Sequence, residues 1–222
     1  MVKEIFKPIY QKIFPSLVLY LKRELSNCNT VLDLGCGNNS LLQYCNASFS
    51  LGVENFEPYL KENKKKRIHN QYIKADITKI DFKPKSFDAV IAIDVLEHLT
   101  KKEGYKLLEK MEKWAKKKII IFTPNGFVFQ DGYDNNPLQE HKSGWEVKEL
   151  EELGFEVFGM NGWKELRGYK ASIKYRPIIL WRIISDLTQK MVYYYPKLAF
   201  QLYAVKKINI NNSKPEQKIY GT

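Results

Sequence analysis

Short apolar segments alternate with amphipathic segments over the first 125 residues, and this alternation restricts the possible folds more than any other feature of the chain. A buried strand takes about four to eight residues, and a helix takes about ten or more. Five segments are predicted as strands, namely residues 30–35, 49–56, 71–78, 86–94 and 117–125. Strands that alternate with helices in this way predict a parallel sheet with helices on both faces.

Three segments between these strands are predicted as helices, namely residues 40–45, 57–66 and 101–117. Ser40 can cap the first of them near its start. The third has a single apolar face, formed by Leu107, Leu108, Met111 and Trp114. Such a face predicts a helix that packs against the sheet.

The pattern changes after residue 125. Residues 126–145 form a long polar and aromatic loop, which is typical of a functional or a disordered segment. Residues 146–163 are predicted as helix, turn and strand, and residues 198–208 as a last strand. Residues 176–196 are predicted as an amphipathic helix. We expect this helix to be buried over the sheet, with a membrane interface as the alternative.

The composition, with 44% hydrophobic and 27% charged residues, predicts a soluble globular protein. No apolar run is long enough to span a bilayer, and the N-terminal residues mix charged and apolar groups too early for a secretory signal. Cys28, Cys36 and Cys45 form no Cys-x-x-Cys pair, so we expect reduced thiols in a cytoplasmic protein. The formal net charge of +11 favours acidic partners, but does not choose among nucleic acid, anionic membrane and phosphorylated small molecules.

A glycine turn follows the first predicted strand, in the sequence VLDLGCGNNSLL. Gly35 and Gly37 are spaced as in the dinucleotide fingerprint G-x-G-x-x-G, but Ser40 occupies the position of the third glycine. That third glycine allows a helix to pack closely under a pyrophosphate. S-adenosylmethionine contains an adenosine but no phosphate and needs only the tight turn. The missing glycine therefore favours S-adenosylmethionine over NAD.

Four carboxylates lie near the carboxyl ends of predicted strands: Asp33, Glu54, Asp76 and Asp94. Ligands of an open parallel sheet bind beyond these strand ends. Glu54 can accept hydrogen bonds from both ribose hydroxyls, which fits NAD as well as S-adenosylmethionine. Asp76 can accept a hydrogen bond from an adenine amino group. The four carboxylates together indicate a ligand site.

The order of the motifs VLDLGCG, GVE, ADI, FDAVIAIDVLEHL and IIIFTPNG resembles that of class I S-adenosylmethionine-dependent methyltransferases, in particular the branch that contains ubiquinone-type O-methyltransferases. The resemblance covers residues 25–158. It implies an α/β, Rossmann-like fold with a mostly parallel seven-stranded sheet, helices on both faces and an antiparallel last strand. The cofactor-binding residues it implies are Asp33, Gly35, Gly37, Glu54, Asp76, Ile77, Asp94 and Val95. For Asp33 the alternative role is to orient loop amides, and for Asp76 it is to cap a helix or turn.

The length of 222 residues suits one well-packed domain. We expect a single methyltransferase domain over residues 1–208. Its expected parts are a helical cap at 1–27, a cofactor-binding core at 28–165, a helical insertion at 166–197 and a last strand at 198–208. Residues 209–222 have little to bury and are expected to be disordered.

Methyl transfer to an oxygen atom requires a positioned nucleophile and a base that takes its proton. His98 follows the fourth strand, and His141 lies in the long loop after the fifth. Both are expected to overhang the same pocket and are the candidate catalytic residues. His69 lies in a basic connection between a helix and a strand, and we expect it at the surface.

A divalent metal is the weaker alternative. Asp94, Glu97 and His98 are spaced so that one helical turn would place them on one face, and His141 would complete a set of two carboxylates and two imidazoles. This set resembles the metal site of small-RNA terminal 2′-O-methyltransferases, although Asp94 replaces the usual glutamate and the loop supplies a single histidine. Without metal, Glu97 and His98 would cap and position a helix.

These features predict an S-adenosylmethionine-dependent methyltransferase that acts on an oxygen of a small molecule, such as a sugar, a lipid-linked or a quinone-like metabolite. An RNA 2′-O-methyltransferase with a divalent metal is the second hypothesis, weakened by the lack of a continuous basic stripe. A non-catalytic cofactor-binding protein is the third, and a Rossmann oxidoreductase is a poor fourth. Nucleic acid and a peripheral membrane contact stay open as partners. The acceptor is expected to meet residues 1–27, 130–145 and 167–196.

Overall fold

The structure is a computed structural model and describes residues 16–132, 134–168 and 171–208. The predicted disordered tail at 209–222 and the first fifteen residues of the predicted helical cap lie outside the described residues.

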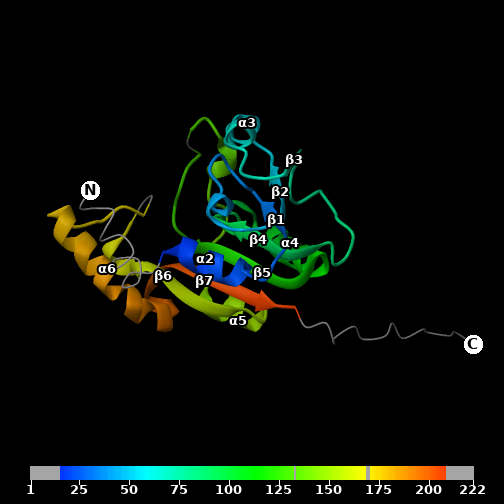
Figure 1. Cartoon of the computed structure of the whole chain (residues 1–222). Helices are drawn as coiled ribbons and strands as arrows, with labels where there is room; N and C mark the ends of the chain where they lie inside the picture. Colours follow the sequence, from blue (N-terminus) through cyan, green and yellow to red (C-terminus); the bar gives the residue numbers. More distant parts are fainter. Residues whose placement is uncertain (1–15, 133, 169–170, 209–222) are drawn as a thin grey trace, which may run out of the picture.

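Seven strands form one sheet in the order β3-β2-β1-β4-β5-β7-β6 (Figure 1). Their bounds are β1 Thr30–Leu34, β2 Phe49–Glu54, β3 Gln71–Lys74, β4 Phe87–Ile93, β5 Ala115–Pro124, β6 Glu156–Trp163 and β7 Ala199–Lys207. Neighbouring strands from β3 to β5 pair in parallel, whereas β7 is antiparallel to both β5 and β6. The expected mostly parallel, seven-stranded sheet with an antiparallel last strand is confirmed.

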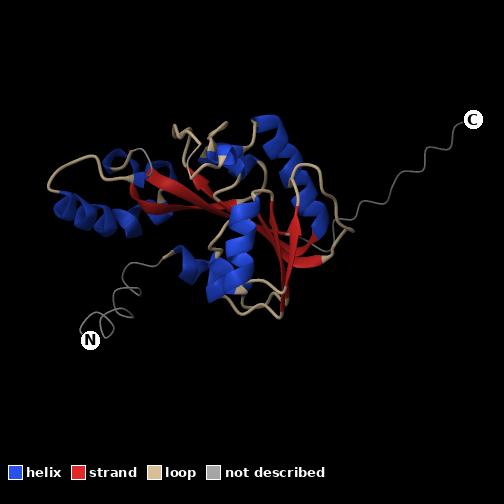
Figure 2. Ribbon diagram, turned by 90° about the horizontal axis from the view of Figure 1, so that it is seen from above, coloured by secondary structure: helices blue, strands red, loops and turns tan. Residues whose placement is uncertain are grey.

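Helices cover both faces of this sheet (Figure 2). The α-helices are α2 Leu17–Leu25, α3 Glu57–Lys66, α4 Lys101–Trp114, α5 Val147–Glu152 and α6 Ile178–Tyr194. Short 3-10 helices are η1 Leu41–Tyr44, η2 Leu96–His98, η3 Pro137–Gln139, η4 Lys164–Leu166 and η6 Pro196–Leu198.

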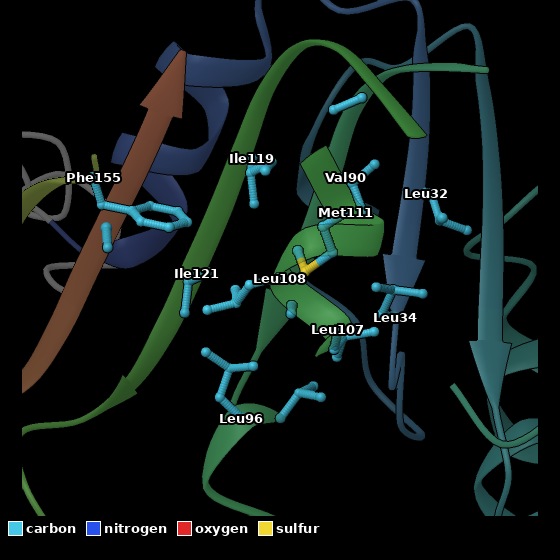
Figure 3. Close-up of a cluster of buried hydrophobic side chains, with 14 of the residues drawn as sticks. Leu32, Leu34, Val90, Leu96, Leu107, Leu108, Met111, Ile119, Ile121 and Phe155 are labelled. Atoms are coloured by element: carbon cyan, nitrogen blue, oxygen red, sulfur yellow. The ribbon is translucent and has the colours of Figure 1, made fainter. Parts of the chain in front are cut away.

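Successive side chains of a strand point to opposite faces, so the sheet has an apolar cluster on each side. On one side α4 packs against β1 and β4, and Figure 3 shows Leu107 and Met111 beside Leu34 and Val90. On the other side α2 packs against the opposite face of the same strands, as in the contact of Leu21 with the second cluster. Both faces of the central strands are therefore buried, and their carboxyl ends are held in a fixed arrangement.

Several predicted boundaries differ from the structure. Residues 40–45 contain only the 3-10 helix η1, because the backbone is already extended at Cys45. The predicted helix 101–117 ends at Trp114, since Ala115 already pairs with Phe87 of β4. The predicted strand 71–78 ends at Lys74, where its pairing with Glu54 of β2 stops.

The expectation that the helix in residues 176–196 is buried over the sheet is met only in part, because α6 packs on the sheet but many of its side chains are exposed. α6 lies along the outermost strand β6, and its buried side chains are Ser185, Gln189 and Val192. Gln189 binds backbone groups of β6 on both sides, donating to the Gly159 carbonyl at 3.0 Å and accepting from the Gly162 N–H at 3.1 Å. These bonds turn Gln189 inward, beside the apolar Val192. Within the described residues, no helix is long and apolar enough to cross a membrane.

Candidate active site

Backbone geometry explains both glycines in the turn after β1. Gly35 has a φ of +63° and Gly37 a φ of +57°, in the left-handed region that costs other residues about 1–2 kcal/mol. A Cβ at Gly35 would lie 2.7 Å from Cγ2 of Val95, whereas a Cβ at Gly37 would have no atom within 4 Å. The open space beside Gly37 allows a ligand to approach the backbone closely.

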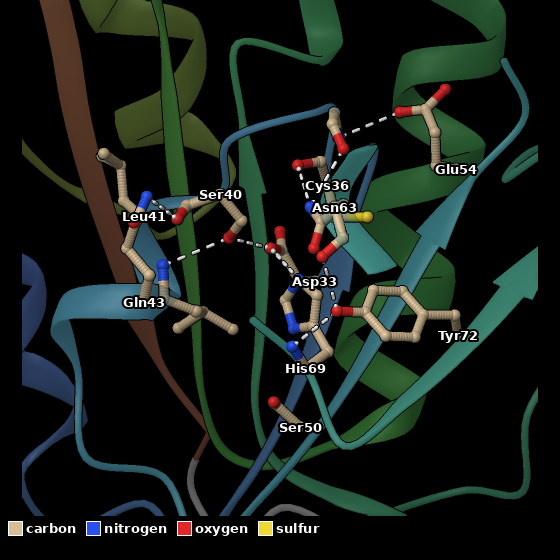
Figure 4. Close-up of polar contacts among 12 residues, drawn as sticks. Asp33, Cys36, Ser40, Leu41, Gln43, Ser50, Glu54, Asn63, His69 and Tyr72 are labelled. Carbon is tan, nitrogen blue, oxygen red and sulfur yellow. Dashed lines mark hydrogen bonds and ion pairs between the residues drawn. The ribbon is translucent and has the colours of Figure 1, made fainter. Parts of the chain in front are cut away.

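Buried side chains hold this turn in place through hydrogen bonds and close contacts (Figure 4). The Ser40 hydroxyl donates to Asp33 Oδ2 at 2.5 Å and accepts from the Leu42 N–H at 3.1 Å, so Ser40 caps the short helix as predicted. His69 Nε2 lies 3.3 Å from the same Asp33 oxygen, and the His69 side chain is fully buried. The prediction that His69 lies at the surface is wrong. Gly52 leaves room for the imidazole of His69, because a Cβ atom at position 52 would lie 2.6 Å from Cδ2 of that ring.

Two of the predicted carboxylates lie at the carboxyl ends of the next two strands: Glu54 ends β2, and Asp76 follows the end of β3. Glu54 accepts the N–H of Gly37 at 3.0 Å and the N–H of Phe56 at 2.7 Å. Burial raises the pKa of Glu54, and these hydrogen bonds oppose the rise. Asp76 Oδ1 accepts from the N–H and the hydroxyl of Thr78, at 2.9 and 2.7 Å. Burial acts to raise the pKa of Asp76, but hydrogen bonds to its charged form outweigh burial and lower the pKa.

A cleft of about 820 Å³, including its open mouth, lies beyond the carboxyl ends of β1, β2 and β4. The predicted cofactor residues that line it are Gly35, Gly37, Glu54, Asp76, Ile77, Asp94 and Val95. Asp33 does not line the cleft, and its carboxylate instead accepts the hydrogen bond from Ser40 described above. Lining residues that sequence analysis missed are Asn55, Thr78, Leu99, Glu103, Asn136, Leu138, Gln139 and Lys142.

A second cavity of about 790 Å³ adjoins the cleft and shares Asp94, His98 and Gln139 with it. Its other lining residues are Glu97, Pro124, Val128, Gln130, His141, Ala171, Phe200 and Gln201. The structure thus brings His98 and His141, the two candidate catalytic residues, to one cavity next to the cleft.

Two neighbouring carboxyl groups, the exposed Asp94 and the buried Glu97, form part of the wall of this second cavity. Asp94 has a φ of +52°, which is strained for a residue other than glycine, and it accepts from Gln201 Nε2 at 3.0 Å. Glu97 is 2% exposed and accepts from the Thr123 hydroxyl at 2.9 Å. Burial and then repulsion from Asp94 raise the pKa of Glu97 well above its usual value. Burial also raises the pKa of Asp94, but this residue keeps an exposed face toward the cavity, so we assign the shared proton to Glu97.

The two histidines present the same nitrogen to the cavity. His98 Nδ1 donates to the Glu140 carbonyl at 3.1 Å, and His141 Nδ1 donates to the Val128 carbonyl at 2.6 Å. With the hydrogen on Nδ1, Nε2 of each ring is an acceptor. Burial lowers the pKa of both histidines, that of His98 to about 4, so both rings are neutral at neutral pH.

The rings of His98 and His141 meet edge to face, with their centroids 4.9 Å apart. One potential ligand atom from each of Glu97, His98 and His141 lies within 4.8 Å of the other two. Asp94, the fourth member of the predicted metal set, is outside this group. Two neutral imidazoles and a carboxyl group at this spacing can hold a divalent metal or hydrogen-bond a single acceptor hydroxyl.

A third cavity continues outward from the second, with which it shares Val128 and Phe200. Phe127 and Phe129 lie at this outer end and are 60% and 62% exposed. Three basic residues, Lys164, Arg167 and Lys174, also line it, together with one acidic residue, Glu165. The path from the cleft to the outside therefore ends in an aromatic and positively charged opening.

Sequence analysis did not identify Gln201 or Thr123 as site residues. Gln201 lies 107 residues after Asp94 in the chain and reaches it because β7 pairs with β5. No local motif marks this contact, which depends on the order of the strands in the sheet.

Comparisons with known proteins agree with this geometry. Residues 32–122, from β1 to β5, match a family of methyltransferase domains. The chain is 27% identical over 134 residues to (S)-coclaurine N-methyltransferase from Thalictrum flavum subsp. glaucum, in a match that covers 56% of this chain and 36% of that protein. It is 25% identical over 201 residues to a small RNA 2′-O-methyltransferase from Tetrahymena thermophila, covering 72% of this chain and 46% of that protein. The chain spans less than half the length of these two relatives.

Solved structures show the same fold. A S-adenosylmethionine-dependent methyltransferase from Archaeoglobus fulgidus superposes with a TM-score of 0.52 at 20% sequence identity, over 91% of this chain and 99% of that one. At this level of identity the similarity describes the fold.

Proposed function

Because the chain carries a class I S-adenosylmethionine-dependent methyltransferase domain, with S-adenosylmethionine as its cofactor, we propose that it transfers a methyl group to an oxygen of a small molecule. When bound, the cofactor supplies an electrophilic methyl group on a sulfonium. The residues of the chain supply a cleft for the cofactor, an adjoining cavity for the acceptor, and a base. A place in the ubiquinone-type branch is part of this proposal.

The cleft beyond β1, β2 and β4 is the proposed cofactor site. Glu54 accepts from the ribose hydroxyls there, since a carboxylate has about four acceptor positions and two are used by backbone N–H groups. Asp76 accepts from the adenine amino group with Oδ2. Gly35 and Gly37 let the backbone approach the methionine part, as the open space beside Gly37 supports.

Three further residues complete this proposed site. Ile77 and Val95 give apolar contacts in the cleft, and Asp94 lies where the cleft meets the second cavity. Asp33 acts indirectly in the proposal, by holding the turn through Ser40 and His69.

His141 is the proposed base for the acceptor hydroxyl. Its Nδ1–H is bound to the Val128 carbonyl, which fixes the ring and leaves Nε2 free to accept a proton. As the acceptor oxygen attacks the methyl carbon, the carbon–sulfur bond breaks and the hydroxyl proton passes to His141 Nε2. His98 is the second proposed catalytic residue, and its Nε2 is the other acceptor available for that proton, since a hydroxyl donates a single hydrogen bond. Positioned proton transfer of this kind contributes roughly 10²–10⁴-fold to a rate.

The outer cavity indicates the class of acceptor. Exposed aromatic side chains at Phe127 and Phe129 suit a ring or an apolar chain, and the basic residues beside them suit an anionic group. The proposed acceptors are therefore a sugar, a lipid-linked metabolite or a quinone-like metabolite, with a free hydroxyl in the second cavity.

The observation that carries the proposal is that the cleft and the histidine-lined cavity share Asp94 and His98. Thermal unfolding with S-adenosylmethionine, S-adenosylhomocysteine or NAD tests it. A ligand at a hundred times its dissociation constant should add about 2.7 kcal/mol, which is roughly 5–11 °C for a chain of this size. Glu54→Ala should remove most of the shift, and Glu62→Ala, at an exposed site on α3, should keep it. A shift with NAD alone would refute the proposal.

The second candidate is a metal-dependent RNA 2′-O-methyltransferase, favoured by the close approach of Glu97, His98 and His141. A divalent ion in that position would acidify a ribose hydroxyl. Calorimetric titration with Mn²⁺ or Mg²⁺ tests the site without an activity assay. Binding that is lost in His141→Ala and kept in Lys142→Ala would support this candidate. No binding to the wild-type protein would remove it.

We further propose one domain over residues 1–208, with the cap, core, insertion and last strand at the boundaries expected from the sequence. A cytoplasmic location is also part of the proposal. The unpaired thiols of Cys28, Cys36 and Cys45 support a reducing compartment.

A further inference from the structure

α6 turns two polar side chains, Ser185 and Gln189, toward the protein together with the apolar Val192. Ser185 and Gln189 are buried against β6, and Gln189 binds the Gly159 carbonyl and the Gly162 N–H. The Thr188 hydroxyl accepts from the Trp163 N–H at 3.0 Å. A helix that covers a protein core normally turns its apolar stripe toward that core and its polar side chains toward solvent.

A row of exposed apolar side chains on α6 faces away from the sheet. We call it the outer face of α6, and it consists of Ile179, Leu180, Ile183, Leu187, Met191 and Tyr194. These side chains are from 43% to 77% exposed, the highest value being that of Ile179. Their spacing of three or four residues places most of them on one line along the helix. Contiguous exposed apolar surface of this kind marks an interaction site.

Basic residues surround the outer face. Arg176, Arg182, Lys190 and Lys197 are all exposed, before, within and after α6. Asp186 is the only acidic residue in the sequence of α6, and it is half-buried near Arg167. An apolar stripe next to positive charges is complementary to a partner with an apolar interior and a negatively charged outer layer.

We propose that the outer face of α6 binds the surface of an anionic lipid bilayer, with the helix axis in the plane of the membrane. Burial of the leucine and isoleucine side chains in the acyl region and attraction of the basic residues to acidic headgroups act together in such binding. Tyr194 and Tyr195, 69% and 64% exposed at the end of the helix, fit the headgroup level, where aromatic side chains with a polar atom are preferred.

A second copy of the chain is a poorer occupant. Two outer faces in a symmetric contact would bring Arg182 and Lys190 of one copy close to the same residues of the other. Like charges at close range weaken such a contact, whereas acidic headgroups neutralise them.

The outer face also lies near the proposed acceptor path. Arg167 donates to the Ser185 hydroxyl of α6 at 3.1 Å and lines the outer cavity. If the proposed function holds, membrane binding through α6 brings this cavity close to a lipid-linked acceptor. That consequence rests on the proposed function, whereas the binding of the bilayer does not.

Flotation with lipid vesicles tests the proposal on the full chain. We expect binding to vesicles of phosphatidylcholine with phosphatidylglycerol, and weak binding to phosphatidylcholine alone. The double variant Ile179→Ser/Leu187→Ser should reduce the partition coefficient at least about tenfold, because two exposed apolar side chains lose their burial. Lys190→Gln should reduce it about fivefold at low salt, the equivalent of roughly 1 kcal/mol per basic residue. Ile73→Ser is the matched control, since Ile73 is an exposed isoleucine on β3 at the opposite edge of the sheet.

Melting temperature, oligomeric state and the S-adenosylhomocysteine shift are measured on the same variants. Unchanged melting and cofactor shift, together with lost vesicle binding, would establish the outer face as the membrane site. Equal binding by the wild-type protein and the double variant would overturn the proposal. So would a wild-type dimer that the double variant abolishes, because the face would then bind a second copy. A large fall in melting temperature would also overturn it, since the face would then be covered within the chain. A missing cofactor shift with intact vesicle binding would count against the proposed function alone.

Discussion

Replacing Gly35 and Gly37 with alanine separates two physical reasons for glycine in the turn after β1. Both residues have a left-handed φ. For this reason each substitution by alanine is expected to lower the free energy of unfolding of the protein by about 1–2 kcal/mol. Only Gly35 has a steric neighbour, because its new Cβ would lie 2.7 Å from Cγ2 of Val95. Overpacking of that kind costs about a further 1–3 kcal/mol. We therefore expect a loss of about 1–2 kcal/mol for Gly37→Ala and roughly 2–5 kcal/mol for Gly35→Ala.

Urea unfolding of both variants, alone and with Val95→Ala, measures the two contributions. In the Val95→Ala background the cost of Gly35→Ala should fall to that of Gly37→Ala, because the methyl group that clashes has been removed. Binding of S-adenosylhomocysteine should show a separate effect for Gly37→Ala. Its Cβ fills open space in the cleft, so the affinity should fall at least about tenfold, which is roughly 1.4 kcal/mol. Equal stability losses for the two glycines, or no rescue by Val95→Ala, would refute the assigned roles.

Two other buried groups give testable outcomes. Glu97→Gln should become more stable relative to the wild-type protein as pH rises from about 5 to about 8. The folded state raises the pKa of Glu97 above 4.5, so it holds a proton that the unfolded state releases, and wild-type stability falls over this range. Urea unfolding at both pH values checks this, and a difference that does not change with pH would contradict it. His69→Ala should lose about 2–4 kcal/mol, because it leaves a cavity beneath the glycine turn and removes a partner of Asp33. Lys65→Ala, at an exposed position on α3, should stay within about 0.5 kcal/mol of the wild-type protein, and an equally small loss for His69→Ala would argue against a supporting role.

Local sequence patterns were sufficient to predict much of the fold and most residues of the cleft. A carboxylate at the end of a buried segment can be recognised without knowing the strand order, because all parallel strands end at the same edge of the sheet. Glu54, Asp76 and Asp94 could be placed together for this reason, and the structure has all three on one cleft. The glycine turn was equally predictable, since its spacing reflects backbone angles that glycine adopts most readily.

Contacts between distant parts of the chain could not be predicted in the same way. Gln201 reaches Asp94 because β7 pairs with β5, and no local sequence motif predicts that pairing. His69 was expected at the surface because its neighbours in the sequence are basic, yet the ring enters the space that Gly52 leaves free. In both cases the missing information is which segments lie side by side.

The histidines show a third limit. The sequence places His98 and His141 after neighbouring strands, and from that their shared cavity could be expected. Which ring nitrogen faces the cavity depends on the carbonyl groups of Glu140 and Val128, and those carbonyls are oriented by the course of the loop. The chemistry of the pair therefore follows from backbone positions that residue types do not encode.

The orientation of α6 follows from the strand it packs on. The pairing of β6 with β7 is interrupted between Met160 and Trp163, and this irregularity leaves backbone groups of β6 without a partner in the sheet. Buried backbone N–H and carbonyl groups must be hydrogen-bonded, so the helix that covers them has to present polar side chains. Gln189 and Thr188 meet this requirement at Gly162 and Trp163, and the apolar stripe on the other side of α6 is then forced outward. Periodicity in the sequence revealed the stripe but not its direction, because the direction is decided by unpaired groups of a strand some 25 residues earlier in the chain. A variant of β6 that restored regular pairing would remove the reason for the exposed stripe, and with it the surface proposed to bind the membrane.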